Sequence, residues 1–191
     1  MFLNNYKEIY VNTMIYAGIG SRETPSNILI VMRKMALLMA LDGLTLSTGA
    51  AQGADQAFAE GAAMVHGQIN LHLPWGSYEL DWLRTINAKR FVLRDDDLDA
   101  YRTVDHFHPA PHKLTRGARA LHARNYNIIK DASFVMCWTP DGRPVGGTAQ
   151  AIRIALHAHK QIINLGRAED LEKITDRITK RHDEWRPHFG E

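Results

Sequence analysis

The sequence is poor in cysteine, in long apolar runs and in net charge, and each shortage excludes a class of protein. Cys137 is the single cysteine among 191 residues, so neither a disulfide framework nor a multi-cysteine metal site can form within one chain. It lies in the apolar stretch SFVMCW, which indicates a buried thiol. No stretch reaches the roughly 18 apolar residues of a membrane span, and the N-terminal MFLNNYKEIYVNTM lacks the apolar core of a signal peptide. We therefore expect a soluble, cytoplasmic protein that does not associate with membranes.

The charge balance argues against a strongly electrostatic nucleic-acid binder, because the formal net charge is only +2. Two local strips are nevertheless candidates for contact with single-stranded DNA: Arg84, Lys89, Arg90 and Arg94, and Lys113, Arg116, Arg119 and Arg124. The neighbouring aromatic residues indicate either stacking positions for bases or part of a lid or interface, and they are Trp75, Tyr78 and Trp82.

Alternating apolar runs and helical patterns predict an α/β fold with a mainly parallel sheet and helices on both faces. The chain length fits one domain over residues 1–191, with its core at about 14–166. The expected strands are Met14–Gly20, Leu44–Thr48, Ile69–Trp75, Ser133–Trp138 and Gln161–Gly166. The expected helices cover about 25–41, 54–66, 115–131, 148–159 and 168–180. Thr24 or Ser26 is expected to cap the first helix and Thr115 the third.

The segment from Ser77 to Thr115 is the least regular part of the sequence. It is rich in Asp, His and Pro, and connections of this length inside a compact domain are usually functional or mobile. We expect the Ser77–Lys113 region to form a partial lid. His106, His108 and His112 lie in this segment without a matching ligand set, so we expect no metal site.

Three glycine-bearing junctions follow predicted strands and precede predicted helices. In a parallel sheet such junctions meet at the carboxyl ends of the strands, where ligands bind in open α/β sheets. Glycine allows close approach to the backbone, and the first N–H groups of a helix are free to bind an anion such as phosphate. The candidate ligand-binding residues here are Gly18, Gly20, Ser21 and Arg22 at the first junction, Gly49 and Gly53 at the second, and Gly146, Gly147 and Thr148 at the third.

Charged and polar residues near these junctions allow two interpretations each. Arg22 either reaches an anion on the turns or is a surface arginine, and Asp55 either binds sugar hydroxyls or favours its helix N-terminus electrostatically. Arg124 and Asn125 indicate either a pocket wall or a solvated face. Neither GxGxxG nor GxxxxGK[ST] occurs in the glycine turns, so we expect neither a dinucleotide cofactor nor a P-loop.

The stretches IYAGIGSRETP, STGAAQGADQAFAEGA and VGGTAQAIRIALHAHKQIINLG together resemble the SLOG superfamily of Rossmann-like proteins. This superfamily includes DNA-processing protein A (DprA) and the lonely-guy phosphoribohydrolases. The sequence looks most like short DprA-like proteins of phages and bacteria, in which ARN, CWTPDG and GGTAQAI recur in this order. The resemblance covers roughly Met14 to Gly166 and implies a single Rossmann-like domain, a homodimer, and a ligand over the glycine turns.

The resemblance implies different activities in its different branches. The lonely-guy enzymes cleave the N-glycosidic bond of a nucleoside monophosphate and use a glutamate, whose position falls here on Ala151. Asp55, or alternatively Glu23, then remains to stabilise an oxocarbenium-like centre, and Asp55 is the candidate catalytic carboxylate. DprA proteins instead bind single-stranded DNA in recombination. We therefore expect a nucleotide-binding protein that holds phosphate on its glycine turns and processes the nucleotide, with a DprA-like DNA binder and a non-catalytic nucleotide sensor or sequestering protein as alternatives.

Overall fold

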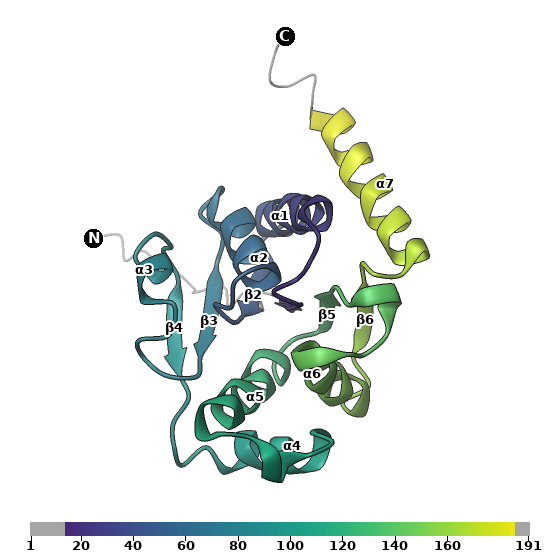
Figure 1. Cartoon of the computed structure of the whole chain (residues 1–191). Coiled ribbons are helices and arrows are strands. Elements are labelled where there is room, and N and C mark those ends of the chain that lie inside the picture. The colour runs from purple at the N-terminus through teal and green to yellow at the C-terminus, as the bar shows by residue number, and fades with distance from the viewer. Residues whose placement is uncertain (1–13, 186–191) are drawn as a thin grey trace, which may run out of the picture.

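A twisted sheet of six short parallel strands forms the centre of the structure, a computed structural model that describes residues 14–185 (Figure 1). The strands are β1 (Ile15–Gly18), β2 (Thr45–Thr48), β3 (Ile69–Leu73), β4 (Lys89–Val92), β5 (Phe134–Cys137) and β6 (Gln161–Asn164). Their order across the sheet is β4-β3-β2-β1-β5-β6, and every neighbouring pair is parallel. The predicted α/β fold with a parallel sheet is confirmed.

Helices cover both faces of this sheet. One face carries α1 (Ser26–Leu41), α2 (Ala54–Ala63) and α7 (Ala168–Trp185), whereas the other carries α4 (Leu98–Phe107), α5 (Arg116–Ile129) and α6 (Gly146–His157) (Figure 1). The short α3 (Leu80–Leu83) lies beside β4 (Figure 1). This two-sided cover explains why β1, β2 and β5 are buried almost throughout and read as continuous apolar runs in the sequence.

Successive residues of β1 point to opposite faces and so join two separate cores. Tyr16 packs with Met32 and Phe58 against α1 and α2, and Ala17 packs with Ile128 and Ala155 against α5 and α6. Cys137 belongs to the second core, where burial raises the pKa of its thiol to about 12. The expectation of a buried thiol is confirmed.

The strand order reverses beside β1. From β1 the chain places β2, β3 and β4 successively outward on one side and then returns to add β5 and β6 on the other. The loops after β1 and β5 therefore diverge to opposite faces of the sheet and leave a crevice between them. Ligands of open α/β sheets bind at such a switch point.

The five predicted strands and five predicted helices are all present, but α3, β4, α4 and two short 3-10 helices, Pro111–Lys113 and Pro140–Gly142, were missed. The segment from Ser77 to Thr115 is largely regular, and within the described chain Tyr78 is its one residue that lines the main cavity. All four residues of β4 are exposed, so this strand carries no apolar run for a sequence pattern to reveal. Thr115 caps α5, as predicted, by accepting a hydrogen bond from the Ala118 N–H.

The predicted side-chain cap of α1 is wrong. Pro25 occupies the N-cap position, no side chain accepts a capping bond, and Thr24 instead donates its hydroxyl to the Ser21 carbonyl. The hydroxyl thus tightens the β1–α1 turn and does not satisfy a helical N–H.

One expectation concerns a segment outside the described residues, namely the absence of a signal peptide. Among residues 14–185, no helix has the length and apolar character needed to cross a bilayer. In the same range, no group of three or more His, Cys, Asp or Glu residues has the arrangement of a metal site.

Candidate functional site

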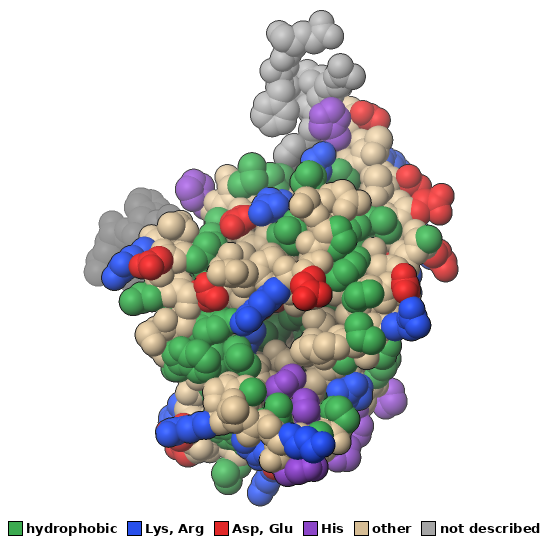
Figure 2. All heavy atoms as spheres, viewed as in Figure 1, with side chains coloured by type: hydrophobic (Ala, Val, Ile, Leu, Met, Phe, Trp, Pro, Cys, Tyr) green, Lys and Arg blue, Asp and Glu red, His purple; other side chains and the backbone are tan. Residues whose placement is uncertain are grey.

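A cavity of about 610 Å³ lies at the carboxyl ends of the strands, where the strand order reverses. Its walls come from the loop after β1, the start of α2, one face of α5 and the start of α6. Figure 2 shows the molecule hollowed near the middle of the face drawn there, with a basic side chain beside the hollow. The volume falls within the range of roughly 300–1,000 Å³ that small-molecule sites occupy.

Nine of the twelve predicted site residues line this one cavity. They are Gly20, Ser21, Arg22, Asp55, Arg124, Asn125, Gly146, Gly147 and Thr148. Residues of the first and third junctions, which are more than a hundred residues apart in the sequence, thus line one cavity together with Asp55. The other three predicted residues, Gly18, Gly49 and Gly53, are all described and lie behind the cavity wall.

Gly18 and Gly53 have packing roles. A Cβ atom on Gly18 would lie 2.7 Å from the Phe58 ring, so this position must remain bare for α2 to pack on β1. Gly53 has a φ of +87° and sits so close to the β1–α1 loop that a Cβ atom would lie 2.8 Å from the Ser21 carbonyl oxygen. Both glycines bring secondary-structure elements together and face no ligand space.

Gly49 is bare because a charged side chain covers it. A Cβ atom at this position would overlap Nη1 of Arg124 and Oδ2 of Asp55. Arg124 comes from α5 and Asp55 from the first turn of α2, so the missing side chain lets an arginine from the opposite face of the sheet reach the end of β2. The close approach that the glycine pattern predicted is therefore made by a guanidinium of the protein itself.

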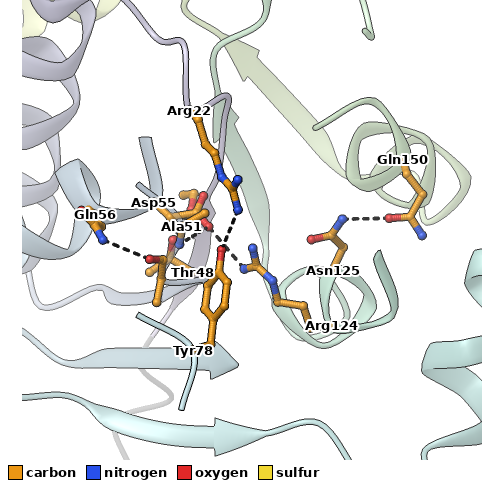
Figure 3. A network of polar contacts seen from close by, with 11 residues as sticks. Arg22, Thr48, Ala51, Asp55, Gln56, Tyr78, Arg124, Asn125 and Gln150 are labelled. Carbon is orange, nitrogen blue, oxygen red and sulfur yellow. Dashed lines mark hydrogen bonds and ion pairs between the residues drawn. The ribbon is translucent and has the colours of Figure 1, made fainter. Parts of the chain in front are cut away.

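Asp55 and Arg124 form a buried ion pair on the cavity wall (Figure 3). The Nη1–Oδ2 distance is 3.3 Å, and the two residues are only 4% and 6% exposed. Asp55 also accepts from the Ala51 N–H at 3.4 Å. Burial raises the pKa of the Asp55 carboxyl, while Arg124 and the backbone N–H groups of Ala51 and Gly20 oppose that rise.

The loop between β2 and α2 is itself pinned by side chains (Figure 3). Thr48 donates its hydroxyl to the Gly18 carbonyl at 2.5 Å, and Gln56 donates to the Ala50 carbonyl at 3.2 Å. The loop that leads into α2 is therefore tied both to β1 and to α2. This fixes the position of the Asp55 carboxylate in the first turn of α2.

Arg22 extends across the cavity from the β1–α1 loop to Tyr78, which follows β3 (Figure 3). Its Nη2 donates to the Tyr78 hydroxyl at 3.1 Å, and this hydrogen bond raises the pKa of the guanidinium, which stays charged. The ring of Tyr78 also faces Arg124, whose guanidinium carbon lies 5.9 Å from the ring centroid. The sequence indicated a stacking, lid or interface role for Tyr78 and not a contact with Arg22, because no local pattern shows that this loop residue is only 6% exposed.

The first turn of α6 presents free backbone donors to the cavity. Val145 occupies the N-cap position and supplies no capping side chain, and a Cβ atom on Gly146 or Gly147 would meet nothing within 4 Å. The turn therefore has open space beside its glycines, and no side chain caps its N–H groups. Such a terminus favours an anion through both its free donors and the helix dipole.

Polar side chains of α5 complete the wall opposite this turn. Asn125 donates to the buried Gln150 of α6 at 2.9 Å (Figure 3). His122 lines the cavity beside His108, with ring centroids 4.7 Å apart, and burial followed by the charge of His108 lowers its pKa. Nε of Arg124 is buried without a hydrogen-bond partner. A buried guanidinium N–H with no acceptor is costly, so Arg124 is held in the wall at the expense of one unsatisfied donor.

The basic strips considered for DNA contact are largely neutralised by nearby acids. Ion pairs join Arg84 to Asp81, Arg94 to Asp96, Arg116 to Asp95, Arg119 to Asp105 and Arg124 to Asp55. Arg90 donates to the Leu83 carbonyl, and Lys89 lies over the Phe91 ring. Five of the eight residues of the strips are thus paired with acids, while Lys89, Arg90 and Lys113 keep their charge. The strips therefore carry less positive charge for a phosphodiester backbone than their sequence indicates.

No protein-family model matches the sequence, and no curated protein matches it. Solved structures with a similar fold do exist. DNA processing protein A from Helicobacter pylori, described with its single-stranded DNA binding mode, is similar with a TM-score of 0.60 and 19% identity over 91% of this chain and 82% of that one. The molybdenum cofactor carrier protein of Chlamydomonas reinhardtii is similar with a TM-score of 0.52 and 18% identity over 86% of this chain and 84% of that one. The chain thus has the Rossmann-like α/β fold of DNA processing protein A and the molybdenum cofactor carrier protein, which confirms at the level of the fold the resemblance indicated by its motifs.

Proposed function

We propose that this protein binds a nucleotide or nucleotide-derived ligand in the cavity between β1 and β5. The phosphate lies between the turn Gly20–Arg22 and the first turn of α6, and the sugar lies towards Asp55. One observation carries this proposal: the uncapped N-terminus of α6 and the guanidinium-bearing Arg22 and Arg124 line the same cavity at the switch point of the sheet.

The charges of the wall suit one phosphate better than a long polyphosphate. Arg22 and Arg124 are the arginines lining the cavity, and Asp55 already balances Arg124. Arg22 makes no ion pair among the described residues, although the exposed Glu23 also lines the cavity. Arg22 and the α6 turn therefore supply the attraction for one anion, and an arginine binds phosphate through directed hydrogen bonds. The side chains of Tyr78, Leu121 and Ala118 give the cavity an apolar side, which is suited to a base.

Isothermal titration calorimetry with a panel of nucleosides and their 5′-monophosphates tests this function. We expect monophosphates to bind at least about tenfold more tightly than the matching nucleosides, a difference of ~1.4 kcal/mol that reports the phosphate site. Equal affinity for a nucleoside and its monophosphate would remove the phosphate cradle from the proposal, and no binding by any member of the panel would remove the function.

Gly147→Ala is expected to weaken monophosphate binding by about tenfold or more, because its methyl group enters the space where the anion approaches the α6 turn. The folded protein itself has room for this methyl, and alanine favours the helix, so Tm should not fall. Gly76→Ala is the matched control, since it also adds a methyl in open space but lies away from the cavity lining. Unchanged affinity in Gly147→Ala would place the ligand elsewhere.

Cleavage of the N-glycosidic bond is the catalytic form of this proposal, with Asp55 as the working carboxylate. Ala151 lines the cavity at the position where the resembling hydrolases carry glutamate, and Asp55 is held by Arg124, so the chain offers one buried carboxylate and not a free pair. Chromatography of a monophosphate panel after incubation tests it. Base release that is lost in Asp55→Asn would establish the enzyme, whereas tight binding without release would indicate a sensor or sequestering protein.

Single-stranded DNA binding is the second candidate function, supported by the similarity to the Helicobacter pylori protein. Because most arginines of the basic strips are paired with acids, we expect affinity for an oligonucleotide to depend only weakly on salt. Fluorescence anisotropy at several salt concentrations checks this. A steep loss of affinity with salt, reporting several phosphate contacts, would favour the DNA-binding function over the small-ligand one.

A homodimer in the cytoplasm completes the proposal and follows from the resemblance of the motifs to DprA-like proteins. Native mass spectrometry of the purified protein measures the subunit number and detects a co-purified nucleotide in the same experiment. A monomer at micromolar concentration would contradict the dimer and leave the ligand site unaffected.

A further inference from the structure

We infer that Tyr78 is a positioning residue that holds Arg22 across the cavity and makes the site selective for phosphorylated over unphosphorylated ligands. This inference deepens the proposed function and rests on it. No sequence motif contains Tyr78, and 56 residues separate it from Arg22.

The surroundings of Tyr78 fix its ring. It is 6% exposed, its ring meets Trp75 edge-to-face at 5.2 Å, and the Arg124 guanidinium lies 5.9 Å from its centroid. A ring held between an indole and a guanidinium has little freedom to rotate away. Its hydroxyl is therefore a fixed acceptor at the cavity, and Nη2 of Arg22 donates to it at 3.1 Å.

The chemistry of the acceptor determines what Arg22 can do. Arg22 is exposed and comes from a loop, so without a partner its long side chain would sample many rotamers. A carboxylate at position 78 would hold it equally well but would neutralise it, as Asp55 does with Arg124. The phenol is neutral and occupies one of five guanidinium N–H donors, so Arg22 keeps its charge and its remaining donors for an anion.

Tyr78 contacts both arginines of the cavity wall, Arg22 through its hydroxyl and Arg124 through its ring, but the two arginines differ in their partners (Figure 3). Arg124 forms an ion pair with Asp55, whereas Arg22 is held by a neutral hydroxyl and lies near acids only at longer range. Because binding an anion does not then require Arg22 to be ordered first, preorganisation by Tyr78 strengthens binding only for ligands that carry the anion.

The test uses Tyr78→Phe, which keeps the ring against Arg124 and Trp75 and removes only the hydroxyl. Affinity for a nucleoside monophosphate and for inorganic phosphate should fall by about tenfold, since one hydrogen bond to a charged group is lost. Affinity for the matching nucleoside should change less than about twofold, because the nucleoside does not contact Arg22. In an Arg22→Ala background, Tyr78→Phe should have no further effect on phosphate affinity.

Tyr101→Phe is the matched control, since the Tyr101 ring also faces an arginine, Arg119 at 6.0 Å, but lies outside the cavity lining. Equal losses for nucleoside and monophosphate in Tyr78→Phe, unchanged phosphate affinity, or additivity with Arg22→Ala would overturn the inference. Wild-type protein that binds inorganic phosphate but no nucleotide would remove the proposed function while leaving the role of Tyr78 to be decided by the phosphate titrations. Wild-type protein that binds neither would overturn both.

Discussion

Gly49→Ala is expected to lower the free energy of unfolding by about 3 kcal/mol or more, the loss associated with breaking a buried ion pair. The added methyl would occupy the position of the Arg124 guanidinium, which must then leave the Asp55 carboxylate. Both groups are almost completely buried, so neither recovers full contact with water in the folded state. For a chain of this size the change corresponds to a Tm about 10 °C lower, measurable by calorimetry.

A double-mutant cycle separates this cause from a general defect of the turn. Arg124→Ala alone should cost about as much as Gly49→Ala, and the double variant should cost no more than either, because the methyl then fills space that the arginine has left. Gly76→Ala, with nothing within 4 Å of the new methyl, is the control and should change stability little. Additive losses in the cycle would contradict the account.

The pH dependence of these variants provides a second check. Burial raises the pKa of Asp55, and losing Arg124 removes the main opposing influence. An acid whose folded-state pKa lies above its unfolded value is best tolerated when protonated, so the deficit of Gly49→Ala should shrink as the pH falls from about 7 towards about 4. A deficit that is constant over this range would exclude Asp55 as its source.

The wild-type protein is expected to lose roughly 3 kcal/mol of stability on acidification through the titration of His72. Burial, followed by the charges of Lys130 and Arg124, lowers the pKa of His72 from 6.5 to about 4. The neutral imidazole is thus stable in the fold, stacked on Phe91 at 5.2 Å, while the unfolded chain takes up a proton at its ordinary pKa. The contribution is complete above about pH 6.5 and is lost as the pH falls through about 4.

His72→Gln isolates this effect, because a glutamine does not titrate. Its denaturant-measured stability should vary with pH less steeply than that of the wild type, by roughly 3 kcal/mol over the same interval. His112→Gln removes an exposed histidine and should leave the wild-type slope intact. Parallel pH profiles for wild type and His72→Gln would contradict the predicted titration.

The buried strands of the sheet were predicted from the sequence, and the exposed edge strand was not. The strands that are covered on both faces, such as β1 and β2, read directly as apolar runs, and their ends were placed within about two residues, the usual error for such boundaries. The edge strand β4 was missed because its sequence, KRFV, is exposed along its whole length, and the polar α4 was missed with it. An edge strand such as β4 is joined to the sheet by backbone hydrogen bonds. Its exposed side chains therefore show no pattern of apolar residues in the sequence.

The cavity-lining residues that belong to local turns were predicted from the sequence. The contacts between residues far apart in the chain were not. Gly20 to Arg22 and Gly146 to Thr148 follow from strand-to-helix junctions, and the structure brings both into one cavity. By contrast, the reason for Gly49 lies 75 residues away in Arg124, and the partner of Arg22 lies in a loop after another strand. Such long-range pairs follow from the topology of the sheet and from no spacing within the chain.

The return of the chain from β4 to β5 has a consequence for the protein as it is made. Arg22, Asp55 and Tyr78 all emerge from the ribosome before β5 exists, whereas the opposing α6 turn follows only at Gly146. A nascent or C-terminally truncated chain therefore offers a ligand one wall of the cavity. A ligand stabilises only the state that binds it. A ligand in this cavity would therefore stabilise the full-length folded chain, in which β5 and α6 have packed beside β1, over shorter chains.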